Sequence, residues 1–263
     1  MTAADKDRWF LFGLATFAGS VLALLPCAAD AQKAAPSTCG TGTSSTAEVI
    51  TVRDGRSLIL ADGRELLLAG IEAAPEGTAA LRRLTAGRTL HLMAVNSSPD
   101  RYGRTTAFAT ADGAGQSLQQ TLLMEGQARV SARVGGADCT HLLLEAERLA
   151  RAAGRGLWSD PNFAPLSSED LTKLAAGRGQ FALVEGKVLS VRESGATIYV
   201  NFGRRWTRDF TVTILKSQRR TFVAAGLEPE KLASRRIRVR GWVEQRGGPI
   251  IEAAVPEQIE IID

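Results

Sequence analysis

Residues 52–76, VRDGRSLILADGRELLLAGIEAAPE, decide the fold of this chain. Two Asp-Gly dipeptides, at 54–55 and 62–63, are each flanked by apolar residues, which indicates tight turns between β-strands. The proline near the end of the stretch has no N–H for a sheet ladder, so the last strand must end before it. The stretch therefore predicts a β-hairpin followed by a loop that presents Glu72 and Glu76 at a strand end, where functional residues are common.

The composition is that of an ordinary globular protein with a modest basic excess. The 263 residues are 44% hydrophobic and 23% charged, which excludes a disordered or fibrous chain, and the length suits one large domain or two small ones. The formal net charge of +4 permits an anionic partner without requiring one. Residues 46–160 hold 13 Lys+Arg and 13 Asp+Glu, whereas residues 170–263 hold 16 and 11, so the second half carries the basic excess.

The N-terminal residues have the pattern of an export signal. Lys6 and Arg8 precede an apolar run over residues 9–26, and the small residues at 29–31 offer a cleavage point. This pattern is typical of a secretory signal peptide over residues 1–31. Because about 18 apolar residues is borderline spanning length, an uncleaved anchor in the inner membrane over the same run is the alternative. The first interpretation predicts a periplasmic or secreted protein.

Two cysteines remain once the predicted signal peptide is removed, Cys39 and Cys139. Two thiols in an oxidising compartment predict one disulfide. Closing a loop of roughly 100 residues stabilises the fold by about 4 kcal/mol in the chain-entropy model. The alternative is a pair of free thiols, since Cys39 lies in a stretch rich in Gly, Ser and Thr.

Two strand-rich segments predict a mainly β protein. Residues 47–160 combine alternating apolar runs with three helical patterns, which indicates a five-stranded Greek-key barrel of OB type with about three helices. Residues 177–263 predict a second five-stranded OB-type barrel in tandem. Residues 32–46 and 161–176 are expected to be linkers, the second with a short helix. The helices of the first barrel are expected at residues 78–86, 117–125 and 140–153, and Ser117 is the expected N-cap of the second.

The first segment contains, in order, the motifs VRDGRSL at 52–58, LAGIE at 68–72, PE at 75–76, DRYGR at 100–104 and GLW at 156–158. Together they resemble the staphylococcal nuclease-like (thermonuclease, TNase-like) family over roughly residues 46–160. The resemblance implies a phosphodiester hydrolase that uses Ca²⁺ held by two aspartates, a glutamate acting on water and two arginines on the phosphate. Residues 239–259 are separately similar to the end of OB-fold nucleic-acid-binding domains.

The resemblance assigns roles to four positions. Asp54 matches the first aspartate of the family's Asp-Gly-Asp-Thr motif, and Glu72 stands where the family has its second metal-binding aspartate. Glu76 matches the glutamate that acts on water, and Arg104 matches one phosphate-binding arginine. Glu76 and Arg104 are therefore the candidate catalytic residues, and Asp54 and Glu72 are the candidate Ca²⁺ ligands.

Three departures from the family pattern weaken this site. Arg56 stands at a metal-ligand position, and a cation there repels Ca²⁺, which takes hard oxygen ligands. Leu67 stands where the family has its first phosphate-binding arginine, and leucine cannot supply a bidentate clamp. One extra alanine in 73–74 displaces Glu76. We therefore expect little or no metal-dependent cleavage and no bound Ca²⁺.

The second segment contains a basic loop with one aromatic residue. Cations that flank an aromatic side chain suit a phosphate backbone with a base stacked on the ring. The alternative is a solvated basic face with the tryptophan packed against the barrel. The predicted nucleic-acid-binding residues are Arg204, Arg205, Trp206 and Arg208. Six further arginines would extend this surface: Arg219, Arg220, Arg235, Arg236, Arg238 and Arg240.

Three functions follow from these patterns. The leading hypothesis is an exported thermonuclease-family protein with a degenerate site, which binds nucleic acid (DNA or RNA) or another anionic polymer. The second is a divergent endonuclease in which Arg56 or Arg64 replaces the metal and Glu76 remains the base; its counterpart is a dead site in which Glu76 and Arg104 form a structural ion pair. The third is an envelope scaffold whose barrels bind proteins.

Overall fold

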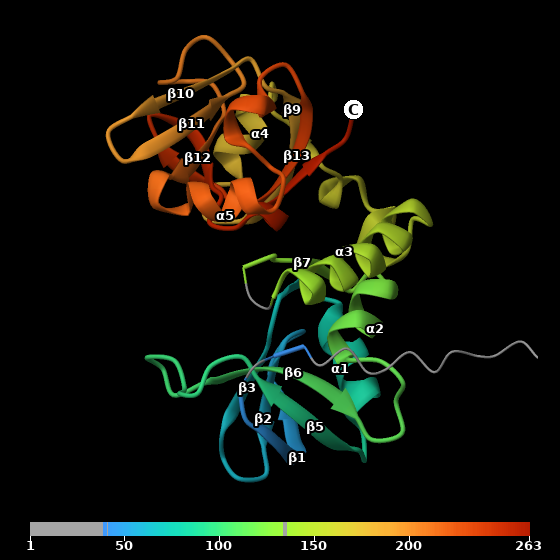
Figure 1. Cartoon of the computed structure of the whole chain (residues 1–263). Helices are drawn as coiled ribbons and strands as arrows, with labels where there is room; N and C mark the ends of the chain where they lie inside the picture. The colour runs from blue at the N-terminus through green and yellow to red at the C-terminus, as the bar shows by residue number, and fades with distance from the viewer. Residues whose placement is uncertain (1–38, 41, 134–135) are drawn as a thin grey trace, which may run out of the picture. The chain divides into compact units, whose positions relative to one another are not determined.

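The computed structural model describes residues 39–40, 42–133 and 136–263, and these residues are mainly β (Figure 1). The predicted signal peptide or anchor over residues 1–31 lies outside the described part of the chain. Within the described ranges, no helix is long and apolar enough to cross a bilayer.

A closed five-stranded barrel forms the first half, as the sequence predicts. Its strands follow the order β1-β2-β3-β6-β5, and β5 pairs with β1 to close it. Every neighbouring pair is antiparallel except β3 and β6, which are parallel. The strands are β1 (Ser44–Val52), β2 (Ser57–Leu60), β3 (Glu65–Leu68), β5 (Thr89–Ala94) and β6 (Thr105–Ala111). Fully buried leucines of these strands fill the interior: Leu58, Leu60, Leu66 and Leu90.

The two Asp-Gly dipeptides form the turns on either side of β2. Asp54 Oδ1 accepts hydrogen bonds from the backbone N–H groups of Arg56 and Ser57, each at 2.8 Å. Asp62 Oδ1 accepts one from Arg64 N at 3.0 Å, and Gly63 has a φ of +84° that suits a glycine. These aspartates close the turns through their own side chains, so the hairpin is encoded locally.

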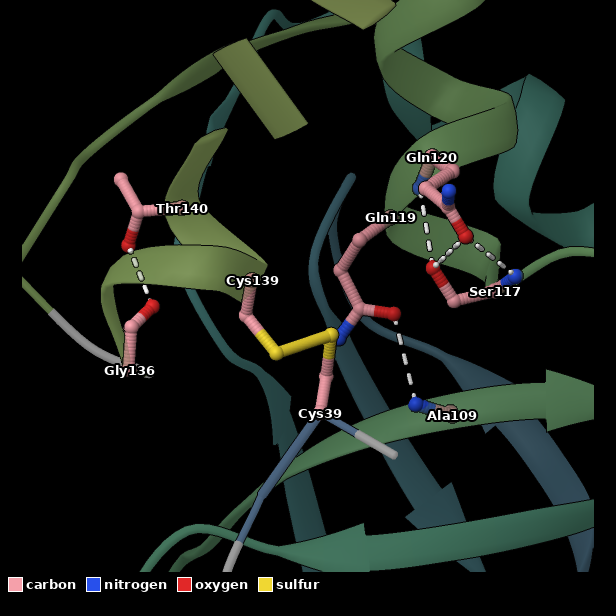
Figure 2. Close-up of a disulfide and its surroundings, with 8 residues drawn as sticks. All are labelled: Cys39, Ala109, Ser117, Gln119, Gln120, Gly136, Cys139 and Thr140. Atoms are coloured by element: carbon pink, nitrogen blue, oxygen red, sulfur yellow. Dashed lines mark hydrogen bonds between the residues drawn. A yellow bond between two sulfur atoms is a disulfide. The ribbon is translucent and has the colours of Figure 1, made fainter. Parts of the chain in front are cut away.

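Three helices and a short two-stranded ribbon complete the first half. The helices are α1 (Gly77–Thr85), α2 (Leu118–Met124) and α3 (Ala137–Ala152), close to the predicted positions. The predicted cap of α2 is present: Ser117 Oγ accepts from Gln120 N at 3.2 Å and Gln120 reaches back to Ser117 N (Figure 2). The ribbon pairs β4 (Ile71–Ala73) with β7 (Ala128–Val130), and Glu72 lies opposite Arg129.

The predicted disulfide is present. Cys39, which precedes β1, is bonded to Cys139 in the first turn of α3, with a Cα–Cα distance of 5.5 Å (Figure 2). Beside it, the buried side chain of Gln119 accepts from Ala109 N at 3.3 Å and donates to Ala107 O at 3.0 Å, which links α2 to β6. The disulfide therefore ties the chain that enters the barrel to the helix that leaves it.

The second half consists of two sheets around one apolar cluster. One sheet has the order β10-β11-β12-β15-β14 and the other β16-β13-β9-β8. The strands are β8 (Leu166–Ser167), β9 (Phe181–Lys187), β10 (Ser190–Ser194), β11 (Thr197–Asn201), β12 (Thr211–Leu215), β13 (Arg236–Trp242), β14 (Glu244–Arg246), β15 (Gly248–Glu252) and β16 (Ile259–Ile261). The helices are α4 (Leu171–Ala176) and α5 (Arg219–Ala224), and 3₁₀ turns span Gly156–Ser159, Pro161–Phe163, Lys216–Gln218, Pro229–Leu232 and Pro256–Gln258.

Two sheets arise where the sequence predicts one five-stranded barrel because two long strands change partners midway. Val188 donates to Arg235 O in one sheet, and the next residue, Leu189, donates to Asn201 O in the other. β13 and β14 are likewise separated only by Val243. If β9 with β10, and β13 with β14, are each counted as one interrupted strand, the strands pair in the same order as in the first barrel. The parallel pair β12 and β15 then corresponds to the parallel pair β3 and β6.

The two halves meet in a buried charge cluster within one compact unit. The guanidinium of Arg240 on β13 is fully buried and contacts the fully buried carboxylate of Glu147 on α3 at 2.9 and 3.1 Å. It also donates to Val130 O at 3.0 Å and to Glu260. Arg238 pairs with Glu185 at 2.6 Å and with Glu260 at 3.1 Å.

The prediction that the arginines of β13 extend a basic surface is therefore wrong for Arg238 and Arg240. Their alternation does place them on one face of the strand. That face lies against carboxylates, because β9 and β16 on either side place Glu185 and Glu260 opposite Arg238. The charges are thus neutralised within the fold.

Candidate nuclease-type site and basic groove

The Arg56 side chain forms an ion pair with Glu72. Its Nη1 atom lies 2.8 Å from Glu72 Oε1 and donates to Ile71 O at 3.1 Å. The side chain of Glu72 is 14% exposed, and this burial raises the pKa of its carboxyl group, against the opposing effect of Arg56 and Arg129. Arg56 and Glu72 stand at positions that the family resemblance assigns to metal ligands, and here the two side chains pair with each other.

The other candidate ligand, Asp54, is used by its own turn. One of its oxygens accepts both amide hydrogen bonds of the turn, from Arg56 N and Ser57 N. Among the described residues, no three His, Cys, Asp or Glu side chains are grouped so that they could hold a metal ion.

Glu76 lies at the start of α1 with an exposed side chain. The extra alanine before it is accommodated in the bend between β4 and α1. Ala73 keeps its place in the ribbon opposite Ala128, and Ala74 N donates to Gln127 O at 2.9 Å. Within the described ranges, no side chain is hydrogen-bonded to the Glu76 carboxylate or paired with it.

Arg104 pairs with Asp100 and not with Glu76, so the prediction of a Glu76–Arg104 ion pair is wrong. Arg104 Nε lies 2.9 Å from Asp100 Oδ2 and Nη2 lies 2.8 Å from the same oxygen. Hydrogen bonds from the Arg104 backbone and side chain lower the pKa of Asp100. The pairing is local because residues 100–104 form a tight turn, with Tyr102 66% exposed at its tip.

Leu67 occupies β3 opposite Ser57 and brings no charge to the site. A different arginine stands near Glu72. Arg129 lies opposite Glu72 in the β4–β7 ribbon, and its guanidinium carbon is 5.6 Å from the Phe163 ring centre and 5.2 Å from that of Phe181. Burial lowers its pKa, while Glu147 and Glu72 act in the opposite direction.

Sequence reasoning missed Arg129. The alternation Ala128-Arg129-Val130 indicates that Arg129 lies on the face opposite the two buried residues. It does not show which strand pairs with this one, and the partner determines that Arg129 lies beside Glu72.

Residues 71–160 match the family model described as staphylococcal nuclease homologue. The closed barrel and the order of its elements agree with that match. Residues 71–160 form a staphylococcal nuclease-like domain. The match begins at Ile71, so it includes neither Arg56, in the turn before β2, nor Leu67 on β3, although β2 and β3 belong to the same closed barrel. No curated protein matches the chain.

A groove of about 830 Å³ lies outside the nuclease-like domain, on the second half of the chain. The Trp206 side chain at its edge is 70% exposed, so the prediction that this ring packs against the barrel is wrong. Leu189 on another wall is 48% exposed. The groove is lined by β10, β11 and the loop after β11, with Arg192, Tyr199, Asn201, Arg204 and Trp206 among its residues.

The predicted basic loop divides into two parts. Arg204 and Trp206 line the groove, whereas Arg205 and Arg208 are exposed but do not line it. Asp209 closes the loop: its Oδ2 accepts from Arg205 N at 2.8 Å, and its N–H donates to Arg205 O at 2.7 Å.

One carboxylate of the groove, Glu193, is neutralised by two cations. Lys216 lies 3.0 Å from it, Arg219 also pairs with it, and hydrogen bonds from both lower the pKa of Glu193. Arg219 is therefore a partner of Glu193 and also of Glu230, at 2.7 Å. Among the described residues, no carboxylate pairs with Arg192 or Arg204, and these two supply the positive charge of the groove.

Proposed function

We propose that this is an exported thermonuclease-family protein that binds nucleic acid and has lost the metal-dependent cleavage of its family. The observation that carries the proposal is the ion pair between Arg56 and Glu72. A divalent cation and a guanidinium compete for the same carboxylate, and the guanidinium is part of the chain. Ca²⁺ takes six to eight oxygen ligands, which this site does not offer. The residues present therefore do not fit the ion.

The phosphate-binding side of the site is also reduced. A bidentate arginine clamp is absent at Leu67, and Arg104 is engaged by Asp100. Glu76 keeps an exposed carboxylate, but a general base alone does not neutralise the charge that develops on the phosphate. Loss of both the cation and one clamp supports a binding role over a catalytic one.

The groove of the second half supports nucleic acid as the ligand. Its exposed Trp206 offers a ring face for a base, and Arg192 and Arg204 offer charge for the backbone. Each base stacked on an aromatic ring contributes about 1–3 kcal/mol without reading sequence. We place the strand in this groove, which favours single-stranded over duplex nucleic acid because only unpaired bases expose their faces.

Cleavage and binding assays test the proposal. The full chain is incubated with single- and double-stranded DNA, with Ca²⁺ or with chelator, beside an active nuclease as positive control. We expect no cleavage that depends on the metal. Chelator-sensitive cleavage that disappears in Glu76→Gln would contradict the proposal and identify a divergent endonuclease.

Binding is measured by fluorescence anisotropy of a labelled single strand at several salt concentrations. Trp206→Ala should weaken binding about 5- to 100-fold, and Arg204→Gln should also reduce the slope against salt. Arg178→Gln, which removes an exposed arginine outside the groove, is the charge-matched control. Equal affinity in the wild type and the three variants would show that the strand does not bind in the groove. No binding of the strand at all would favour the scaffold hypothesis.

A further inference from the structure

A second cavity lies beside Glu72 and is separate from the groove. Its volume is about 330 Å³, which is within the range of small-molecule sites. The nuclease-like domain contributes Glu72 and Arg129, and residues beyond the matched segment contribute Phe163, Phe181 and Trp242. Most of the walls therefore come from parts of the chain that the family match does not include.

The Arg129 guanidinium gives the cavity a cation that lacks a close anionic partner. It lies over the rings of Phe163 and Phe181. In the described part of the chain, no oxygen accepts a hydrogen bond from it. The nearby carboxylates are already bonded to other cations, Glu72 to Arg56 and Glu147 to Arg240. A partly buried cation without an acceptor is costly, and a bound oxyanion would satisfy it.

The remaining walls suit a planar ring with polar edges. Phe181 and Trp242 form an edge-to-face pair with ring centres 6.0 Å apart. The side chains of Asn162 and Gln180 are exposed at the cavity, and an amide both donates and accepts hydrogen bonds. An anion anchor, aromatic walls and adaptable amides together match a phosphate attached to a base.

We propose that this cavity binds a nucleoside monophosphate, either free or as the phosphorylated end of a strand, with the phosphate on Arg129. The inference extends the proposed nucleic-acid binding but uses a different site. A terminal phosphate carries more negative charge than a phosphate within the chain, so Arg129 favours strand ends. The ring then lies against Trp242 or Phe181.

Calorimetry on the full chain tests the site with five probes: adenosine 5′-monophosphate, adenosine, inorganic phosphate, and an oligothymidine with and without a 5′-phosphate. We expect the monophosphate to bind about ten-fold or more tightly than adenosine or phosphate. Arg129→Gln should remove this advantage, because hydrogen bonds to a charged group are lost. Arg129→Lys, which keeps the charge but not the planar fork, should restore part of it.

Arg88→Gln is the control: this exposed arginine lines neither the cavity nor the groove, so its substitution should leave binding of the monophosphate unchanged. No binding of the monophosphate, or equal affinity in wild type and Arg129→Gln, would overturn the inference. If inorganic phosphate binds as tightly as the monophosphate, the proposed contact of the base with Trp242 or Phe181 would be overturned. If the unphosphorylated strand fails to bind while the monophosphate binds, the proposed groove function fails and the cavity stands.

Discussion

The Arg56 guanidinium, in the turn before β2, lies 2.8 Å from the Glu72 carboxylate on β4. The family resemblance assigns both positions to metal ligands, and here an arginine side chain occupies one of them. The surrounding barrel needs no metal to close, because its turns are bonded by Asp54 and Asp62. We therefore propose that the barrel fold is retained and that the Arg56 guanidinium takes the place of the metal ion in the site.

The buried pair of Arg240 and Glu147 should be among the strongest single determinants of stability. Arg240→Ala removes one of the two arginines that pair with the fully buried carboxylate of Glu147 and leaves it with Arg151 at 2.8 Å, and we expect a loss of about 3 kcal/mol in the free energy of unfolding by urea. The exposed pair of Arg148 and Glu145 is the control, for which Arg148→Ala should leave the free energy of unfolding nearly unchanged. Equal effects of the two substitutions would show that the contact between the halves contributes little.

Glu72 should make stability fall as pH rises. Burial raises its pKa above the ordinary value, so the folded state holds the proton more tightly than the unfolded chain. The free energy of unfolding then decreases as pH increases from the ordinary glutamate range, about 4.3, through the folded pKa. Glu72→Gln removes this contribution. In urea unfolding between about pH 4 and 7, the wild type should lose more stability than the variant; parallel curves would argue against a raised pKa.

The disulfide between Cys39 and Cys139 should stabilise the first half. It closes a loop with a sequence separation of 100, and the chain-entropy model gives about 4 kcal/mol for its loss on reduction. The measurement is urea unfolding with and without reductant, with a mass gain of two hydrogens to confirm reduction. A variant with both cysteines changed to serine should show the lower stability and no response to reductant. An unchanged unfolding midpoint in reduced wild type would contradict this prediction.

Local signals in the sequence predict the first barrel well. The Asp-Gly turns, the Ser117 cap of α2 and the alternation of buried leucines each act over a few residues, and each has the expected outcome. The pair of Cys39 and Cys139 also follows from a count of the cysteines outside the predicted signal peptide. These features need no knowledge of distant partners.

Long-range pairing explains what the sequence could not predict. Arg240 has the same alternation as an exposed strand arginine, but its contacts include Val130 and Glu147, 110 and 93 residues away. Arg104 is an exception, because its motif assigns it to the site but it pairs with Asp100 within the same turn. Arg129 has no motif at all, and it becomes part of the site through the pairing of β7 with β4.

Calorimetric titration of the protein with Ca²⁺ tests the central claim most directly. The wild type should give no binding heat, because Arg56 already neutralises Glu72. Arg56→Asp should bind Ca²⁺, since it removes the cation and adds a carboxylate opposite Glu72. Ca²⁺ binding by the wild type that is lost in Glu72→Gln would contradict the account and would restore the site to a metal-dependent nuclease.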